Sequence, residues 1–79
     1  MEIHFMLKKS QHVVPFFNGW AVKAEGRKTV SAITTRQSEA ISIAKDLAMK
    51  LKGEVVVHGR NGKIREVNNY NKVPLPVKG

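Results

Sequence analysis

The chain has 79 residues, no cysteine and a formal net charge of +8, which excludes a second hydrophobic core, disulfide bonds and cysteine-based zinc sites. With 42% hydrophobic and 25% charged residues, its composition is that of a folded globular protein and not of a disordered chain. No apolar stretch is long enough to span a bilayer, and the one at residues 3–7 is too short for a secretory signal, so we expect a cytoplasmic protein.

An Asn-Gly pair separates two runs rich in β-branched and aromatic residues, at 12–17 and 20–25. This pattern predicts a β-hairpin whose turn places positive φ angles at Asn18 and Gly19. Pro15 lies within the first run. Because proline has no N–H to donate to a neighbouring strand, we expect the first strand at an edge of the sheet or interrupted by a bulge.

A third short strand is predicted at 29–34, and the pattern then becomes helical over 37–52. The apolar residues of the helix recur at three- and four-residue spacings: Ala40, Ile41, Ala44, Leu47, Ala48 and Leu51. Thr34 or Thr35 can cap the start of the helix, and Thr34 with Gln37 fits a capping box. Gly53 is placed to take the left-handed conformation that ends many helices. Both ends of the helix are therefore marked in the sequence.

After the helix, a valine-rich strand is predicted at 54–58 and a partner strand at 63–67, joined by a turn at 59–62 that holds a second Asn-Gly pair. The order β-β-β-α-β-β predicts an α+β fold of two layers. In it, an antiparallel sheet of about five strands carries one amphipathic helix packed on one face.

This organisation divides the chain into three parts. Residues 1–10 form an N-terminal extension with the alternation of a further strand, residues 11–67 form a single α+β domain, and residues 68–79 form an irregular, proline-containing tail. The expected core consists of Phe16, Trp20, Val22, Val30, Ile41, Leu47, Leu51, Val55 and Val57. A second apolar set, which includes residues 73–77, cannot face the same interior. Either the tail covers the other face of the sheet, or two chains associate through it.

Two stretches, His-Val-Val-Pro at 12–15 and Val-His-Gly-Arg-Asn-Gly-Lys-Ile at 57–64, resemble a small bacterial domain, the domain-of-unknown-function family 2188. The resemblance extends over residues 11–70, and the Gly-Trp-Ala-Val-Lys stretch at 19–23 contributes to it. Members of the family usually carry aspartate where this chain has Asn61, and both residues suit a turn. The resemblance implies a compact bacterial or phage domain and supports the fold prediction, but it implies no activity.

Few residues of the sequence are candidates for catalytic groups. Asp46 is the only aspartate, the glutamates are scattered, and the three histidines, His4, His12 and His58, lack the spacing of a paired metal site. His12 and His58 lie at strand ends and come close if their strands are neighbours, although a histidine at such a place more often makes a structural hydrogen bond. We therefore expect no enzyme, no metal and no cofactor.

The surplus of positive charge, 14 lysines and arginines against six acids, favours a polyanionic partner. The cations gather at two predicted turns, and if these turns share one end of the sheet, they form a single basic rim. The six candidate binding residues are Lys23, Arg27, Lys28, Arg60, Lys63 and Arg65. The leading hypothesis is nucleic-acid binding through phosphate contacts with little sequence specificity; the simpler interpretation is a solvated, solubility-promoting surface.

The alternative hypothesis is a protein-interaction or homodimerisation module. A strand that carries Pro15 at a sheet edge, or the Val-Pro-Leu-Pro-Val segment at 73–77, would recruit the partner. No membrane partner is expected.

Overall fold

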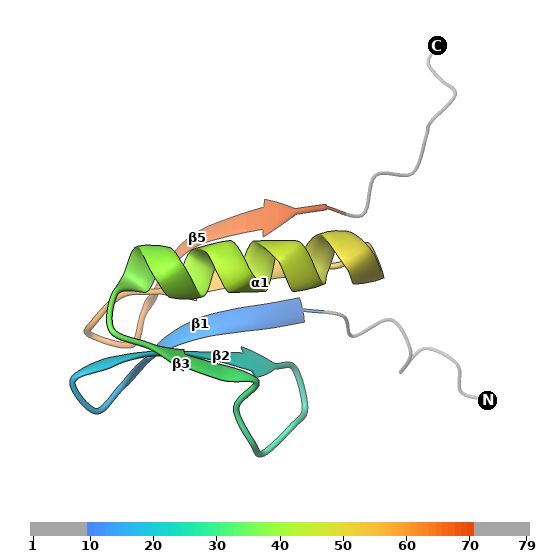
Figure 1. Cartoon of the computed structure of the whole chain (residues 1–79). Helices are drawn as coiled ribbons and strands as arrows, with labels where there is room; N and C mark the ends of the chain where they lie inside the picture. The colour runs from blue at the N-terminus through green and yellow to red at the C-terminus, as the bar shows by residue number, and fades with distance from the viewer. Residues whose placement is uncertain (1–9, 71–79) are drawn as a thin grey trace, which may run out of the picture.

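The computed structural model of the chain describes residues 10–70 (Figure 1). The elements are β1 (Ser10–Phe16), β2 (Gly19–Ala24), β3 (Ala32–Thr34), α1 (Gln37–Leu51), β4 (Glu54–His58) and β5 (Ile64–Asn69). The predicted α+β class and element order are confirmed. β3 is shorter than expected, and β5 continues two residues beyond its expected end. The expectations for an N-terminal strand before Ser10 and for the tail from residue 71 onward lie outside the described residues.

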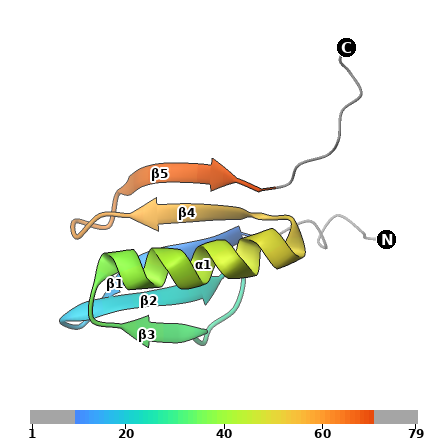
Figure 2. The same cartoon turned by 45° about the horizontal axis from the view of Figure 1, so that its top comes forward.

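The five strands form one mixed sheet in the order β3-β2-β1-β4-β5 (Figure 2). β1 pairs antiparallel with β2 but parallel with β4, from Ser10 opposite Glu54 to Val13 opposite Val57. The prediction of a purely antiparallel sheet is therefore wrong at this one pair. The physical reason is the crossover: α1 returns the chain to the end where β1 begins, so β4 runs in the same direction as β1.

β1 lies at the centre of the sheet and pairs with β2 in unbroken register through Pro15, so the expectation that Pro15 marks an edge strand or a bulge is wrong. The parallel pairing with β4 ends at Val13, two residues before the proline. Pro15 is paired only on its other side, opposite Trp20 of β2. Its missing N–H therefore falls where β1 has a neighbour on one side only, which is the position an edge strand would have provided.

The hairpin between β1 and β2 is confirmed, but its turn lies one residue earlier than predicted. Phe16 is paired with Gly19, so Phe17 and Asn18 are the central turn residues. The positive φ angle, 53°, belongs to Phe17 and not to Gly19. Glycine is needed at position 19 for a different reason, because an added Cβ would lie 2.3 Å from the backbone oxygen of Thr34 in the neighbouring strand.

The helix begins at a different cap from the one predicted. Arg36 is the N-cap residue, and its N–H donates to the Glu39 carboxylate at 3.3 Å. The guanidinium has no acceptor atom, so only this half of a capping box forms. The Thr34 hydroxyl donates to the Arg36 carbonyl at 2.8 Å. The predicted box between Thr34 and Gln37 is therefore wrong, since Thr34 lies two residues before the cap.

At the other end of α1, Lys52 adopts the left-handed conformation that was expected of Gly53, with φ 57° and ψ 43°. Gly53 follows it, and its N–H donates to the Ala48 carbonyl at 2.8 Å. The pair of bonds from Lys52 and Gly53 to the last helical turn forms a Schellman motif. The helix ends at Leu51, one residue before its predicted end, and the left-handed residue is likewise one position earlier than predicted.

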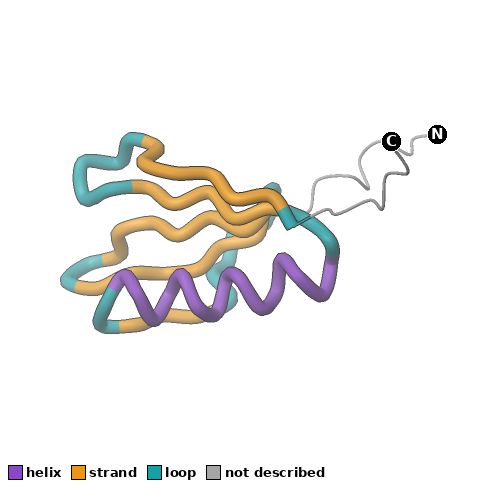
Figure 3. Tube along the Cα trace, turned by 90° about the horizontal axis from the view of Figure 1, so that it is seen from above, coloured by secondary structure: helices purple, strands orange, loops and turns teal. Residues whose placement is uncertain are grey.

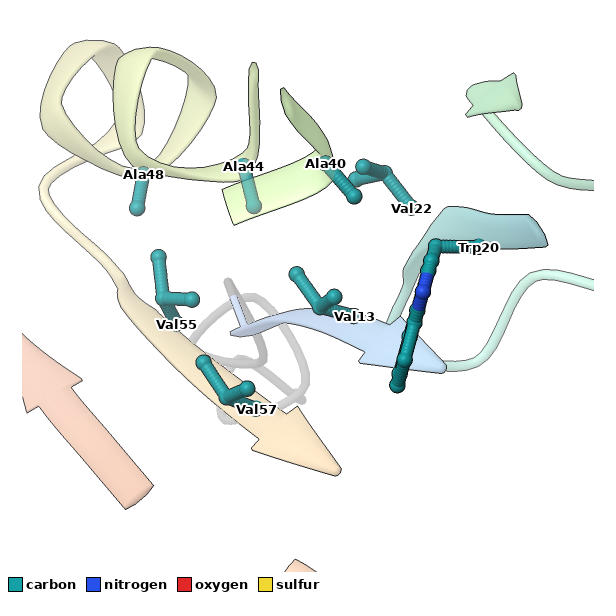
Figure 4. Close-up of a cluster of buried hydrophobic side chains, with 8 residues drawn as sticks. All are labelled: Val13, Trp20, Val22, Ala40, Ala44, Ala48, Val55 and Val57. Atoms are coloured by element: carbon teal, nitrogen blue, oxygen red, sulfur yellow. The ribbon is translucent and has the colours of Figure 1, made fainter. Parts of the chain in front are cut away.

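The core lies between α1 and the sheet (Figure 4). It consists of Val13, Trp20, Val22, Ala40, Ala44, Ala48, Val55 and Val57. The helix contributes only alanines, which recur every four residues along one line and let its backbone approach the valines of the sheet closely. The predicted members Phe16, Val30, Ile41 and Leu47 are only partly buried, and Leu51 is 46% exposed in the last helical turn. Ile41 and Leu47 pack against this core from the side, so the predictions for Phe16, Val30 and Leu51 are wrong, whereas Trp20, Val22, Val55 and Val57 are confirmed.

The helix covers one face of the sheet only (Figure 3). Side chains alternate between the faces of a strand, so the residues between the core positions point to the other side. We call this surface the open face; among its apolar residues are Val14, Ile33, Ile64 and Val67. The last three are 60%, 60% and 52% exposed.

No helix in the described part of the chain is long and apolar enough to cross a membrane.

Candidate functional site

The fold separates the six candidate cations into two groups. Lys23, Arg27 and Lys28 lie on β2 and the connection from β2 to β3, whereas the other three lie on the β4–β5 turn and the start of β5. These connections are at opposite ends of the sheet (Figure 2), so one rim of six cations does not form. The element order already indicated this separation. The chain reverses direction at every connection, so successive connections lie at alternate ends of the sheet.

The β4–β5 turn places the second group of cations at a defined position. The Gly62 N–H donates to the Gly59 carbonyl at 2.9 Å, and the Gly59 N–H donates to the Lys63 carbonyl at 2.8 Å. Gly62 has a φ of 85°, a conformation that glycine adopts without strain. The Asn61 side chain accepts a further bond from the Lys63 N–H at 3.0 Å. The turn is thus stabilised by hydrogen bonds within its own backbone and by one to the side chain of Asn61.

Arg60 joins this turn to the β1–β2 turn. Its guanidinium donates to the carbonyls of Phe17, at 3.4 Å, and Asn18, at 3.3 Å. The same group lies over the Trp20 ring, 4.5 Å from the ring centroid. A cation above the face of an aromatic ring is attracted by the ring's quadrupole. Arg60 therefore links two loops that are more than 40 residues apart in the sequence.

The start of the helix lies at the same end of the sheet (Figure 1). Arg65 donates to the Gln37 side-chain oxygen at 2.6 Å, and Gln37 in turn donates to the His58 carbonyl at 3.2 Å. Arg36, at the N-cap, belongs to this end as well. The sequence analysis did not include it, because the cap was expected at Thr34 or Thr35; the available signal was a cation directly before the apolar period of the helix.

We call Arg36, Arg60, Lys63 and Arg65 the turn-end cluster. None of the four forms an ion pair with an acidic side chain of residues 10–70. Arg60 and Arg65 donate to uncharged oxygens, and the positive end of the helix dipole lies beside them. Their charge is therefore not neutralised by a bound carboxylate of the described chain. A hollow borders the turn and is lined by Gly59, Arg60, Asn61, Lys63, Ile64 and Arg65.

The two histidines do meet across the open face. Nδ1 of His12 lies 2.9 Å from Nε2 of His58, and the rings are 5.2 Å apart between centroids. His12 also contacts Glu25 through its other nitrogen, at 2.5 Å. The ring nitrogens are directed at each other and at Glu25, and not at a common point. Accordingly, no group of three or more potential ligands within residues 10–70 is arranged to hold a metal ion.

Comparison with known proteins gives two matches. The family model "Uncharacterized protein conserved in bacteria (DUF2188)" matches residues 11–70. The chain is also similar to "Uncharacterized protein YdaT" of Bacillus subtilis (strain 168), with 43% identity over 60 residues. That match covers 76% of this chain and 40% of the relative, so the chain spans less than half of the relative's length. No solved structure matches the chain.

Proposed function

The chain belongs to the bacterial DUF2188 family, and we propose that it is a small, non-enzymatic domain that binds nucleic acid through phosphate contacts. The observation that carries this proposal is the turn-end cluster, in which four cations of one end have no carboxylate partner within residues 10–70. Guanidinium groups bind phosphate oxygens through paired N–H donors. The positive end of the helix dipole adds to the attraction for an anion.

Little base discrimination is expected from such a site. The cations lie on a turn, at a strand start and at a helix cap, and not along one face of a helix as in groove-reading helices. Contacts with phosphates position a nucleic acid but do not read its sequence. The proposed binding is therefore sensitive to salt and tolerant of sequence.

A titration of a fluorescently labelled oligonucleotide at several salt concentrations tests this function. If the four cations each neutralise one phosphate, the logarithm of the affinity falls against the logarithm of the salt concentration with a slope of about −3 to −4. The variant K63Q/R65Q should make this slope shallower by about 2. Arg60 is left unchanged, because it also connects the two turns.

The opposite end of the sheet offers a matched control. The variant R27Q/K28Q removes the same number of charges, but at the connection between β2 and β3. Wild-type slope and near wild-type affinity are expected for it. Equal losses in both variants would indicate general attraction to a basic protein, and absence of binding at about 20 mM salt would overturn the proposal.

A second candidate function, self-association, is supported by the open face. Ile33, Ile64 and Val67 are all more than half exposed on a sheet surface that α1 does not cover. Ile64 and Val67 share the edge strand β5, whereas Ile33 lies on the opposite edge strand, β3. Exposed apolar side chains on an uncovered sheet face favour association with a partner. The route through Pro15 no longer applies, because β1 is central. The candidate partner is a second copy of the chain, packed against this face.

A further inference from the structure

Phe17, at the tip of the β1–β2 turn, combines two unfavourable features. Its side chain is 88% exposed, and its backbone has a φ of 53°, in the left-handed region that a Cβ disfavours. Glycine or asparagine usually occupies such a hairpin position. A large ring there gains no stability from the core. Strained backbone positions of this kind are often found at functional sites.

The ring is nevertheless held in place. Phe16 packs edge-on against it, with centroids 4.7 Å apart and an interplanar angle of 84°. Arg60 donates to the backbone carbonyls of Phe17 and Asn18, at 3.4 and 3.3 Å, and so anchors the turn that carries the ring. An exposed aromatic ring on a fixed support loses little entropy when it stacks on a ligand.

The surroundings of the ring suit a nucleotide. Arg60 belongs to the turn-end cluster, so the aromatic group and the cations lie at the same end of the molecule. The ring also borders a hollow of about 270 Å³, whose lining includes Phe16, Ile33 and Thr34. A planar apolar group beside cations that have no carboxylate partner within residues 10–70 matches the two parts of a nucleotide, the base and the phosphate.

We propose that the nucleic acid bound by this domain is single-stranded and that Phe17 stacks on one of its bases. The inference rests on the proposed function and makes it more specific. In a duplex, the base faces are covered by neighbouring bases, so a ring at the tip of a turn has nothing to stack on. In an unpaired strand every base offers a face, and stacking on an aromatic side chain is tolerant of sequence.

The test compares a labelled single-stranded oligonucleotide with the duplex of the same sequence, in DNA and RNA forms. The wild-type protein should bind the single strand more tightly. Phe17→Gly should weaken single-strand binding by about 5- to 150-fold, the value of one stacked base, and should leave duplex binding unchanged. The same substitution should raise the melting temperature, because it relieves the left-handed strain.

Two further variants separate stacking from other effects. Phe17→Leu keeps an apolar side chain but removes the ring, and should lose most of the same affinity. Met49→Ala removes an exposed apolar side chain from the helix, 52% exposed, and should bind as the wild type does. The inference is overturned if Phe17→Gly retains full single-strand affinity, or if the duplex is preferred, while salt-dependent binding persists. Loss of all binding by the wild type would instead overturn the proposed function.

Discussion

Nδ1 of His12 lies 2.9 Å from Nε2 of His58, and this contact joins the two stretches on which the family resemblance depends. Nδ1 of His58 is 3.1 Å from the carbonyl oxygen of Gly62, which only accepts, so this nitrogen carries a hydrogen. In the neutral imidazole, Nε2 of His58 then carries no hydrogen, and it accepts from the Nδ1–H of His12. The other nitrogen of His12 lies 2.5 Å from the Glu25 carboxylate.

The hydrogen-bond chain predicts the tautomer of His58, which is assigned here from its partners. Long-range proton–nitrogen NMR spectra should show hydrogen on Nδ1 of His58 and not on Nε2. His12→Phe removes the donor to His58 and should lower the free energy of unfolding by about 1 kcal/mol. Glu25 is 38% exposed, so Glu25→Gln, which keeps a hydrogen-bonding partner, should change it by less than about 0.5 kcal/mol. A hydrogen on Nε2 of His58 would contradict the assignment.

Gly19 is expected to tolerate no side chain, since an added Cβ would lie 2.3 Å from the Thr34 carbonyl oxygen. Gly19→Ala should therefore force β2 and β3 apart and lower the free energy of unfolding by roughly 1–3 kcal/mol or more in urea titrations. Gly26→Ala is the matched comparison. Gly26 has a φ of 82° and open space around it, so only backbone strain of about 1–2 kcal/mol is expected. Equal stability of Gly19→Ala and the wild type would show that the strands separate without loss.

Gln11 is a buried polar residue in the central strand, only 4% exposed. Its side-chain oxygen has no hydrogen-bond partner in the described part of the chain. An unsatisfied buried polar group lowers stability, so Gln11→Met should raise the free energy of unfolding by about 1 kcal/mol. In contrast, Gln37 bonds Arg65 and His58, so Gln37→Met should not stabilise the protein. Destabilisation by Gln11→Met would indicate that the amide has a partner.

Self-association through the open face can be measured by sedimentation. The wild-type protein should form dimers as its concentration is raised. I64T/V67T removes two exposed apolar side chains of β5 while it keeps β-branching at both positions, and it should remain monomeric with its fold intact. A double substitution on the helix, Met49→Ala with Leu51→Ala, is the control and should leave the dimer in place. A wild-type protein that stays monomeric at every concentration would exclude this second function.

Local pattern determined the elements of this protein. The helix period, the two Asn-Gly pairs and the valine run of β4 depend on residues close together in the chain, so their positions agree with the structure to within a few residues at most ends. The errors at the two helix caps are shifts of one or two residues along the chain. Arg36 replaces Thr34 and Lys52 replaces Gly53, because neighbouring positions compete for a cap by small energies that tertiary packing outweighs.

The tertiary structure alone decided which elements are neighbours. Pairing β1 with β4 brings His12 to His58 and sets the β4–β5 turn beside the β1–β2 turn, where Arg60 reaches the carbonyl of Phe17. The six predicted cations are divided by the same arrangement. Strand pairing is a contact between distant parts of the chain. Its energy comes from burying valines and alanines, and these residue types do not indicate which strand they will pack beside. The surface chemistry of one end of this sheet is therefore a consequence of the fold and not of any single motif.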